Sequence, residues 1–221
     1  MSTTINKQNK TSKVVVIGPS DTFDILLETY SGEICFEGYL GLESRQTFPY
    51  STYKYLGSDE YIQTCDKSIS MAIATYSNAT RKKLFEFCFA RQLNMIGATH
   101  PSAHVSSTAK IGVGCFIFPG SIVSTSAVVS SGVIVGYGAL VGHDVSIDEF
   151  SFISPGVRLL GEAKIGSKVL IGANTVVLPK VRIGDNVKVS PGCVVYKDIP
   201  NNSIMMNVAS NRIFGGGDES S

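Results

Sequence analysis

The sequence predicts a small α/β domain with a parallel sheet, followed by an all-β solenoid of six-residue repeats. Two observations carry this prediction. Stretches typical of strands and helices alternate over residues 13–98, and from Val105 to Val195 an aliphatic residue recurs at every sixth position, sixteen times in one phase. At 221 residues the chain is long enough for one large domain or two small ones.

In the first half, an apolar strand is expected at residues 13–17 and a helix at 22–30. Further strands are expected at 34–40 and 70–74, with a longer helix at 81–93. This alternation favours a parallel sheet, in which ligands bind beyond the carboxyl ends of the strands. The loop after the first strand is therefore a candidate binding site. It carries no glycine-rich phosphate motif, and a purely structural turn fits it equally well.

The second half is defined by its period. The residue four positions after each repeated aliphatic is small or β-branched from Ala109 to Cys193, which gives two inward positions per repeat. Twelve of the thirteen glycines between residues 105 and 195 fall one or three positions after the aliphatic, where we expect a corner to need a permissive backbone; Gly161 alone is out of phase. A period of six excludes an amphipathic helix and predicts about five stacked coils of 18 residues.

Composition excludes several classes of protein. Nineteen basic residues balance 18 acidic ones without a long run of one sign, so we expect no nucleic-acid partner. The five cysteines are scattered, which favours a reducing, cytoplasmic compartment. No apolar stretch is long enough for a signal peptide or a membrane span, so the chain is expected to be soluble.

Three segments carry a resemblance to known proteins. Residues 165–170 (Ile-Gly-Ser-Lys-Val-Leu) are similar to the repeat of the hexapeptide-repeat acyltransferases. Residues 96–103, a hinge, and residues 141–148, in the coils, resemble the sialic-acid O-acetyltransferase and nucleotide-sugar N-acetyltransferase family. The likeness extends from residue 13 to about residue 200. It implies a left-handed parallel β-helix, a Rossmann-like N-terminal domain and a homotrimer.

The resemblance also implies how the chain is divided. A flexible tail (1–12) would precede an α/β domain (13–98) that binds the nucleotide-sugar acceptor. A β-helix (99–200) would hold acetyl-CoA, the donor substrate, and a C-terminal segment and tail (201–221) would follow. No metal cofactor is expected, because the three histidines are placed so that they cannot supply a three-histidine site.

His143 is the candidate catalytic base. It lies two positions after Val141, in a phase that the inward positions do not use, so it should face outward. A neutral imidazole can take the proton of an attacking amine or hydroxyl, although an inert surface histidine is the alternative. The resemblance implies that Asp144 orients this ring and that the backbone N–H of Gly161, one 18-residue coil further on, polarises the thioester carbonyl. A solvated corner carboxylate and a simple bend are the alternatives for these two residues.

The family's other contacts map onto positions in both halves. Its acetyl-CoA contacts fall on Ala173 and Pro191, one coil apart, and Phe152 replaces a second histidine near acetyl-CoA and the acceptor. The implied acceptor-binding positions are Ser20, Asp21, Thr22, Gly41, Leu42 and Asn78. Residues 20–22 replace a loop that contains glycine and histidine, and Gly41-Leu42 replace an acidic residue.

The expected function is therefore transfer of an acetyl group from acetyl-CoA to the amino group of a nucleotide-linked amino-deoxysugar. Three alternatives are open. They are O-acetylation of a sugar such as sialic acid, a metalloenzyme like the γ-carbonic anhydrases, and a β-helical scaffold without chemistry.

Overall fold

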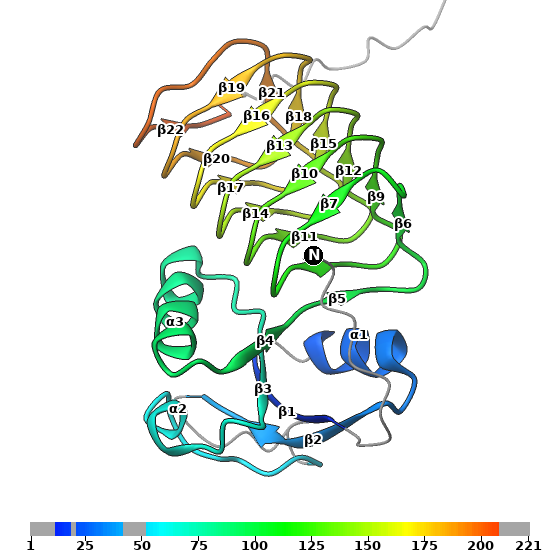
Figure 1. Ribbon diagram of the computed structural model, residues 1–221. Helices are drawn as coiled ribbons and strands as arrows, with labels where there is room; N and C mark the ends of the chain where they lie inside the picture. Colours follow the sequence, from blue (N-terminus) through cyan, green and yellow to red (C-terminus); the bar gives the residue numbers. More distant parts are fainter. Residues whose placement is uncertain (1–11, 19–20, 42–51, 208–221) are drawn as a thin grey trace, which may run out of the picture.

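The computed structural model describes residues 12–18, 21–41 and 52–207, which form two parts joined end to end (Figure 1). An α/β unit extends to Ile96, and stacked coils follow from Ala98. Most of the two segments expected as tails lies outside the described residues. Within residues 201–207 the chain still forms a strand that pairs with the coils.

The α/β unit contains one four-stranded parallel sheet in the order β2-β1-β3-β4. Its elements are β1 (Ser12–Ile17), α1 (Asp21–Tyr30), β2 (Ile34–Tyr39), α2 (Tyr61–Thr64), β3 (Ser70–Ile73), α3 (Asn78–Ala90) and β4 (Asn94–Ile96). The five expected elements are present within a few residues of their predicted limits. No pattern in the sequence indicates α2 or β4, which are only four and three residues long.

The two long helices pack on opposite faces of this sheet. Phe23 of α1 joins a buried cluster with Val14 and Val16, whereas Phe85 of α3 joins a different cluster with Val15. Because successive strand residues point to opposite faces, the helices form the outer layers of a three-layer unit.

The coils form three parallel sheets, each with its strands stacked along one axis (Figure 1). We name each sheet after its first strand. The β5 sheet contains β5 (Ala98–Thr99), β8 (Phe116–Ile117), β11 (Ile134–Val135), β14 (Phe152–Ile153), β17 (Leu170–Ile171), β20 (Lys188–Val189) and β22 (Ile204–Met205). The β6 sheet contains β6 (His104–Val105), β9 (Ile122–Val123), β12 (Leu140–Val141), β15 (Arg158–Leu159), β18 (Val176–Val177) and β21 (Val194–Val195). The β7 sheet contains β7 (Lys110–Ile111), β10 (Val128–Val129), β13 (Ser146–Ile147), β16 (Lys164–Ile165) and β19 (Arg182–Ile183).

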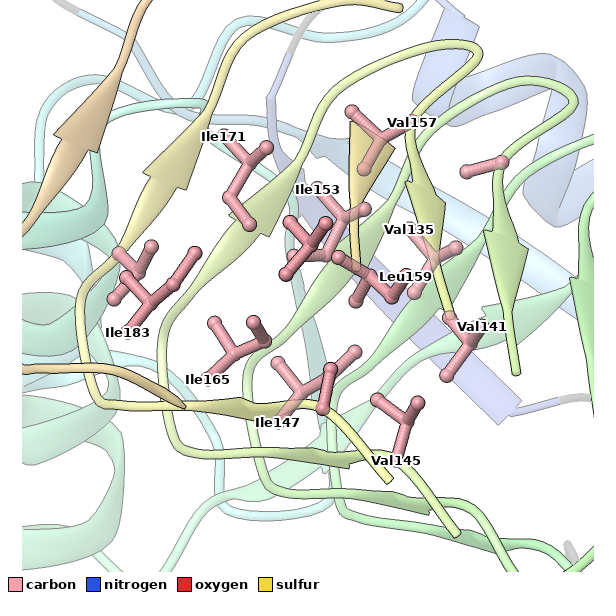
Figure 2. Close-up of a cluster of buried hydrophobic side chains, with 14 of the residues drawn as sticks. Val135, Val141, Val145, Ile147, Ile153, Val157, Leu159, Ile165, Ile171 and Ile183 are labelled. Atoms are coloured by element: carbon pink, nitrogen blue, oxygen red, sulfur yellow. The ribbon is translucent and has the colours of Figure 1, made fainter. Parts of the chain in front are cut away.

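The strand register fixes the 18-residue coil. Val141 pairs with Leu159, and every pairing from β5 to β21 has the same spacing. The repeated aliphatics point into the interior, where Figure 2 shows them packed against one another, and Val141 and Leu159 are fully buried. This arrangement of stacked parallel sheets is consistent with a left-handed β-helix of hexapeptide repeats.

The chain turns a corner after each strand, and two positions of each corner restrict the residue type. Every sixth residue from Gly114 to Gly192 has a left-handed backbone; six of these positions are glycine and eight are not. Glycines one position after the aliphatic have no such conformation. A Cβ on Gly142 would instead lie 2.7 Å from the carbonyl oxygen of Leu159 in the next coil. The expectation of a permissive backbone is therefore wrong for the glycines one position after the aliphatic. These glycines instead allow adjacent coils to approach closely.

Candidate active site

The corner between the β6 and β7 sheets carries His143. Because Val141 pairs with Leu159, the residue stacked on His143 in the next coil is Gly161. The imidazole lies directly against this glycine, since a Cβ built on Gly161 would be 2.3 Å from Nε2 of His143. The backbone is held by the hydrogen bond from the N–H of Glu162 to the carbonyl of His143, at 2.9 Å. Gly161 thus leaves room for the ring.

Asp144 contacts the same imidazole. Its Oδ2 lies 2.9 Å from Nδ1 of His143, and both side chains are exposed. Neighbouring strand residues point to opposite faces, so this contact needs a corner. The φ angle of Asp144 is +58°, which provides one. A carboxylate at Nδ1 favours the tautomer with its proton there, which leaves the Nε2 lone pair beside Gly161 able to accept a proton.

A groove of about 570 Å³ follows the corner between the β5 and β6 sheets. Three predicted cofactor positions, Phe152, Ala173 and Pro191, line it together. Ala173 and Pro191 stack in one column above Pro155, because the N–H of Gly192 donates to the carbonyl of Ala173 at 2.8 Å. Such a column suits an extended ligand running along the helix axis. Pro191 offers no N–H, so its contacts with a ligand are apolar or through its carbonyl.

His143 and the groove are on opposite edges of the β6 sheet. Four of the six outward residues of this sheet are aliphatic, among them Ile122, 42% exposed, and Val194, 52% exposed; the other two are His104 and Arg158. Exposed aliphatic side chains on a sheet face are typical of an interface. Within one chain, therefore, the candidate base and the groove do not meet.

A second cavity, of about 550 Å³, lies at the carboxyl ends of the first three strands. This is the place where parallel sheets bind ligands. Gly41 lines it, together with Gly18, Thr75 and Asp59. The backbone of Gly41 is engaged by the fold, because its N–H donates to Gly57 and its carbonyl accepts from the Tyr55 hydroxyl. Two other predicted positions, Ser20 and Leu42, lie outside the described residues.

Asp21 and Thr22 occupy the first turn of α1. Thr22 is fully buried, and its hydroxyl oxygen has no hydrogen-bond partner among the residues that the structure describes; a Cβ on Gly18 would lie 2.8 Å from it. Oδ2 of Asp21 accepts hydrogen bonds from the hydroxyls of Tyr76, at 2.9 Å, and Tyr137, at 3.2 Å. Asp21 therefore connects the loop after β3 with the first coils.

Asn78 and Arg81 of α3 anchor the α/β unit on the coils. The Asn78 amide donates to the carbonyl of Val169 at 3.1 Å, and its oxygen accepts from Arg81. Arg81 is fully buried and donates to the carbonyls of Gly132 and Phe150 at 2.6 and 2.8 Å. Burial lowers its pKa to about 10. Both polar groups of the Asn78 side chain are thus occupied, one by the coils and the other by Arg81 of the same helix.

Sequence reasoning missed Tyr76 and Tyr137. Both line the groove, and the ring of Tyr76 stacks on that of Phe152 with centroids 5.0 Å apart. The pKa of Tyr137 is raised to about 12, first by burial and then by the nearby Asp21 carboxylate. One signal was available. Tyr137 holds an outward corner position whose equivalents in the next three coils are Pro155, Ala173 and Pro191.

Over the described ranges, no group of three or more histidine, cysteine, aspartate and glutamate side chains is placed to hold a metal ion. Nor does any helix in this part of the chain have the length and apolar character needed to cross a bilayer.

Comparison with known proteins finds a bacterial transferase family and a solved acetyltransferase domain. Residues 162–197 match the family described as bacterial transferase hexapeptide (six repeats). The acetyltransferase domain of PglB from Neisseria gonorrhoeae FA1090, solved with acetyl coenzyme A, is 25% identical, with a TM-score of 0.81 over 90% of this chain and 97% of that one.

Two further solved structures share the fold. PerB from Caulobacter crescentus, solved with CoA and GDP-perosamine, is 22% identical with a TM-score of 0.80, over 89% of this chain and 94% of that one. WeeI from Acinetobacter baumannii AYE is 14% identical with a TM-score of 0.61, over 88% and 96% of the two chains. These likenesses extend over both parts of the chain, and so the α/β unit and the coils occur together in other proteins.

Proposed function

We propose that this chain is a hexapeptide-repeat acyltransferase of the nucleotide-sugar N-acetyltransferase type, and that it moves the acetyl group of acetyl-CoA to the amino group of a nucleotide-linked amino-deoxysugar. The observation that carries this proposal is the contact of His143 with Asp144 on one side and Gly161 on the other. A base, its orienting carboxylate and a backbone N–H beside the base are groups that acetyl transfer to an amine can use. PglB, similar over nearly all of its solved domain, was solved with acetyl coenzyme A.

In the proposed reaction, His143 accepts the proton of the acceptor amine at Nε2 while the amine nitrogen bonds to the thioester carbonyl carbon. The carbon–sulfur bond then breaks, and the sulfur takes the proton from the His143 imidazolium and leaves as the free thiol of CoA, which restores the neutral base. Asp144 holds the proton on Nδ1 and stabilises the imidazolium that forms. The backbone N–H of Gly161 is the proposed donor to the carbonyl oxygen, where negative charge develops.

We propose that the complete site forms between copies of the chain in a homotrimer. His143 and the column of Ala173 and Pro191 flank opposite edges of the apolar β6 sheet. If this face of each copy turns toward a common rotation axis parallel to the axis of the β-helix, the base of one copy approaches the groove of the next. Burial of Ile122 and Val194 would stabilise such an assembly. We also propose that the coils wind in the left-handed sense.

The donor and acceptor are assigned to different parts of the molecule. Ala173 and Pro191 would contact the pantetheine arm of acetyl-CoA along the groove, with Phe152 near its acetyl end. The α/β unit, over residues 13–98, would hold the nucleotide sugar, with Gly41 in its strand-end cavity. We also propose domain limits at residues 98 and 200, a Rossmann-like fold for the α/β unit and a cytoplasmic location.

The test measures CoA thiol release with acetyl-CoA and two acceptors, a 4-amino nucleotide sugar and sialic acid. We expect activity with the amino sugar, and a loss of ~10²–10⁴ in rate for His143→Ala, because a positioned general base contributes that much. Lys110→Ala is the control, since Lys110 is exposed on the β7 sheet, away from the proposed interface, and lines neither of the cavities described above.

Other results would change the assignment. Activity with sialic acid alone would make the chain an O-acetyltransferase. Full activity of His143→Ala would remove the base from the mechanism. A folded protein that shows no heat of acetyl-CoA binding in calorimetry would support a scaffold without chemistry.

A further inference from the structure

Four aromatic rings form the end of the groove nearest the α/β unit. We call this region the aromatic end; it contains Tyr76, Phe118, Tyr137 and Phe152. Tyr76 and Phe152 stack at an interplanar angle of 6°, and Phe118 meets Tyr137 edge to face with centroids 4.9 Å apart. Tyr76 and Tyr137 are nevertheless 41% and 40% exposed. Large rings held rigid yet open to a groove are typical of a ligand site.

The hydrogen-bonding roles of the two phenol groups at the aromatic end are fixed. Both hydroxyls donate their protons to Oδ2 of Asp21, at 2.9 and 3.2 Å. A phenol has one proton, so the oxygen of Tyr137 can only accept a further hydrogen bond. The polar atoms that this end offers to a ligand are therefore acceptors, and they suit a ligand that donates.

The negative charge around the aromatic end also favours a ligand that donates hydrogen bonds. Asp24 and Glu28, on α1 with Asp21, act on Tyr137 in the same sense as Asp21 and help to raise its pKa to about 12. The phenol thus stays protonated at neutral pH. A field from several carboxylates favours an ammonium group and opposes phosphate. Lys188, the basic residue among those lining the groove, lies in β20, in the same coil as Pro191.

We propose that Tyr137 and Tyr76, oriented by Asp21, recognise an amino or hydroxyl group on the sugar ring of the acceptor. This inference rests on the proposed function and names the part of the acceptor that these residues select. The aromatic end continues directly into the groove of Ala173 and Pro191, so a sugar bound there would lie beside the donor. It also gives Asp21 a role other than phosphate binding.

The test compares two sugar nucleotides that differ only at C4 of the sugar, where one has an amino group and the other a keto oxygen. An amino group donates hydrogen bonds, whereas a keto oxygen only accepts. Calorimetry should show that the native protein binds the amino probe about 10-fold more tightly, which corresponds to one hydrogen bond. Tyr137→Phe and Asp21→Asn should lose this preference. In turnover assays their KM for the acceptor should rise about 10-fold while that for acetyl-CoA stays within about twofold.

Tyr196→Phe is the matched control, because Tyr196 is 67% exposed and lines no part of the groove. The inference is overturned if Tyr137→Phe keeps the native preference. It is also overturned if the folded native protein binds acetyl-CoA but neither probe. Failure of the proposed function gives a different pattern: the amino probe binds with a preference that Tyr137→Phe removes, yet no acetyl group is transferred.

Discussion

Replacing Gly161 by alanine should displace the catalytic base without unfolding the coils. The new Cβ would lie 2.3 Å from Nε2 and 2.5 Å from Cε1 of His143. The backbone on both sides is fixed by ladder hydrogen bonds, including that from the N–H of Lys180 to the carbonyl of Gly161 at 3.0 Å. The exposed imidazole must therefore give way. To reach ordinary contact at about 3.4 Å, the ring has to retreat by about 1.1 Å.

The magnitude follows from that displacement. A misplacement of about 1 Å can cost ~10² in rate, so we expect kcat of Gly161→Ala to fall about 100-fold. The free energy of unfolding should change by less than about 1 kcal/mol, because the clash is with the tip of an exposed side chain. Stopped-flow or thiol-release kinetics give kcat, and thermal denaturation gives the stability.

The double variant Gly161→Ala with His143→Ala tests whether Gly161→Ala lowers kcat by displacing the imidazole. Once the imidazole is absent, the added methyl group should cost little more, so the two losses should not multiply. Lys164→Ala is the control, since Lys164 is an exposed residue of β16 in the same coil as Gly161. A native kcat in Gly161→Ala, or losses that multiply in full, would refute this reasoning.

Four other outcomes are expected. Arg81→Met should lower the free energy of unfolding by about 3 kcal/mol, because several buried carbonyls lose their donor; an unchanged denaturation midpoint would contradict its anchoring role. Ile165→Ala should cost about 2–5 kcal/mol in urea denaturation, against about 0.5 kcal/mol or less for the neighbouring exposed Lys164→Ala. Val194→Glu should reduce both the sedimentation coefficient and the activity, since it puts a charge on the proposed interface; native assembly would exclude that face. Cys35 is exposed while the other four cysteines are buried, so Ellman's reagent should titrate one thiol rapidly in the native protein, and two rapid thiols would contradict the buried set.

The repeat made the coils predictable in detail. Because each hexad adds one strand and one corner, the period alone indicates that residue 161 lies on residue 143, and the structure brings Gly161 against the imidazole. The α/β alternation was also predictable from apolar runs. Strand β4 was not, since its three residues carry no pattern of their own.

The aromatic end could not be derived in this way. Asp21 and Tyr137 are 116 positions apart and belong to halves with different periods, so no register relates them. Their meeting depends on how the α/β unit docks, which Arg81 determines by reaching carbonyls 51 and 69 residues away. Contacts made by docking of this kind leave no periodic pattern in the sequence. The one clue is the residue type at Tyr137, which stands in a column whose other members are proline and alanine.

The 18-residue register also decides which insertions and deletions the coils can accept. One additional hexad between Gly161 and Ala173 would carry every later corner residue to the next edge of the three-sided prism, and Ala173 would leave the groove. A whole additional coil would restore the edge but raise Ala173 by one strand spacing, about 4.8 Å, relative to His143. Chain length is therefore constrained between Gly161 and Ala173, whereas beyond Pro191 whole coils can be added without moving His143 or Ala173.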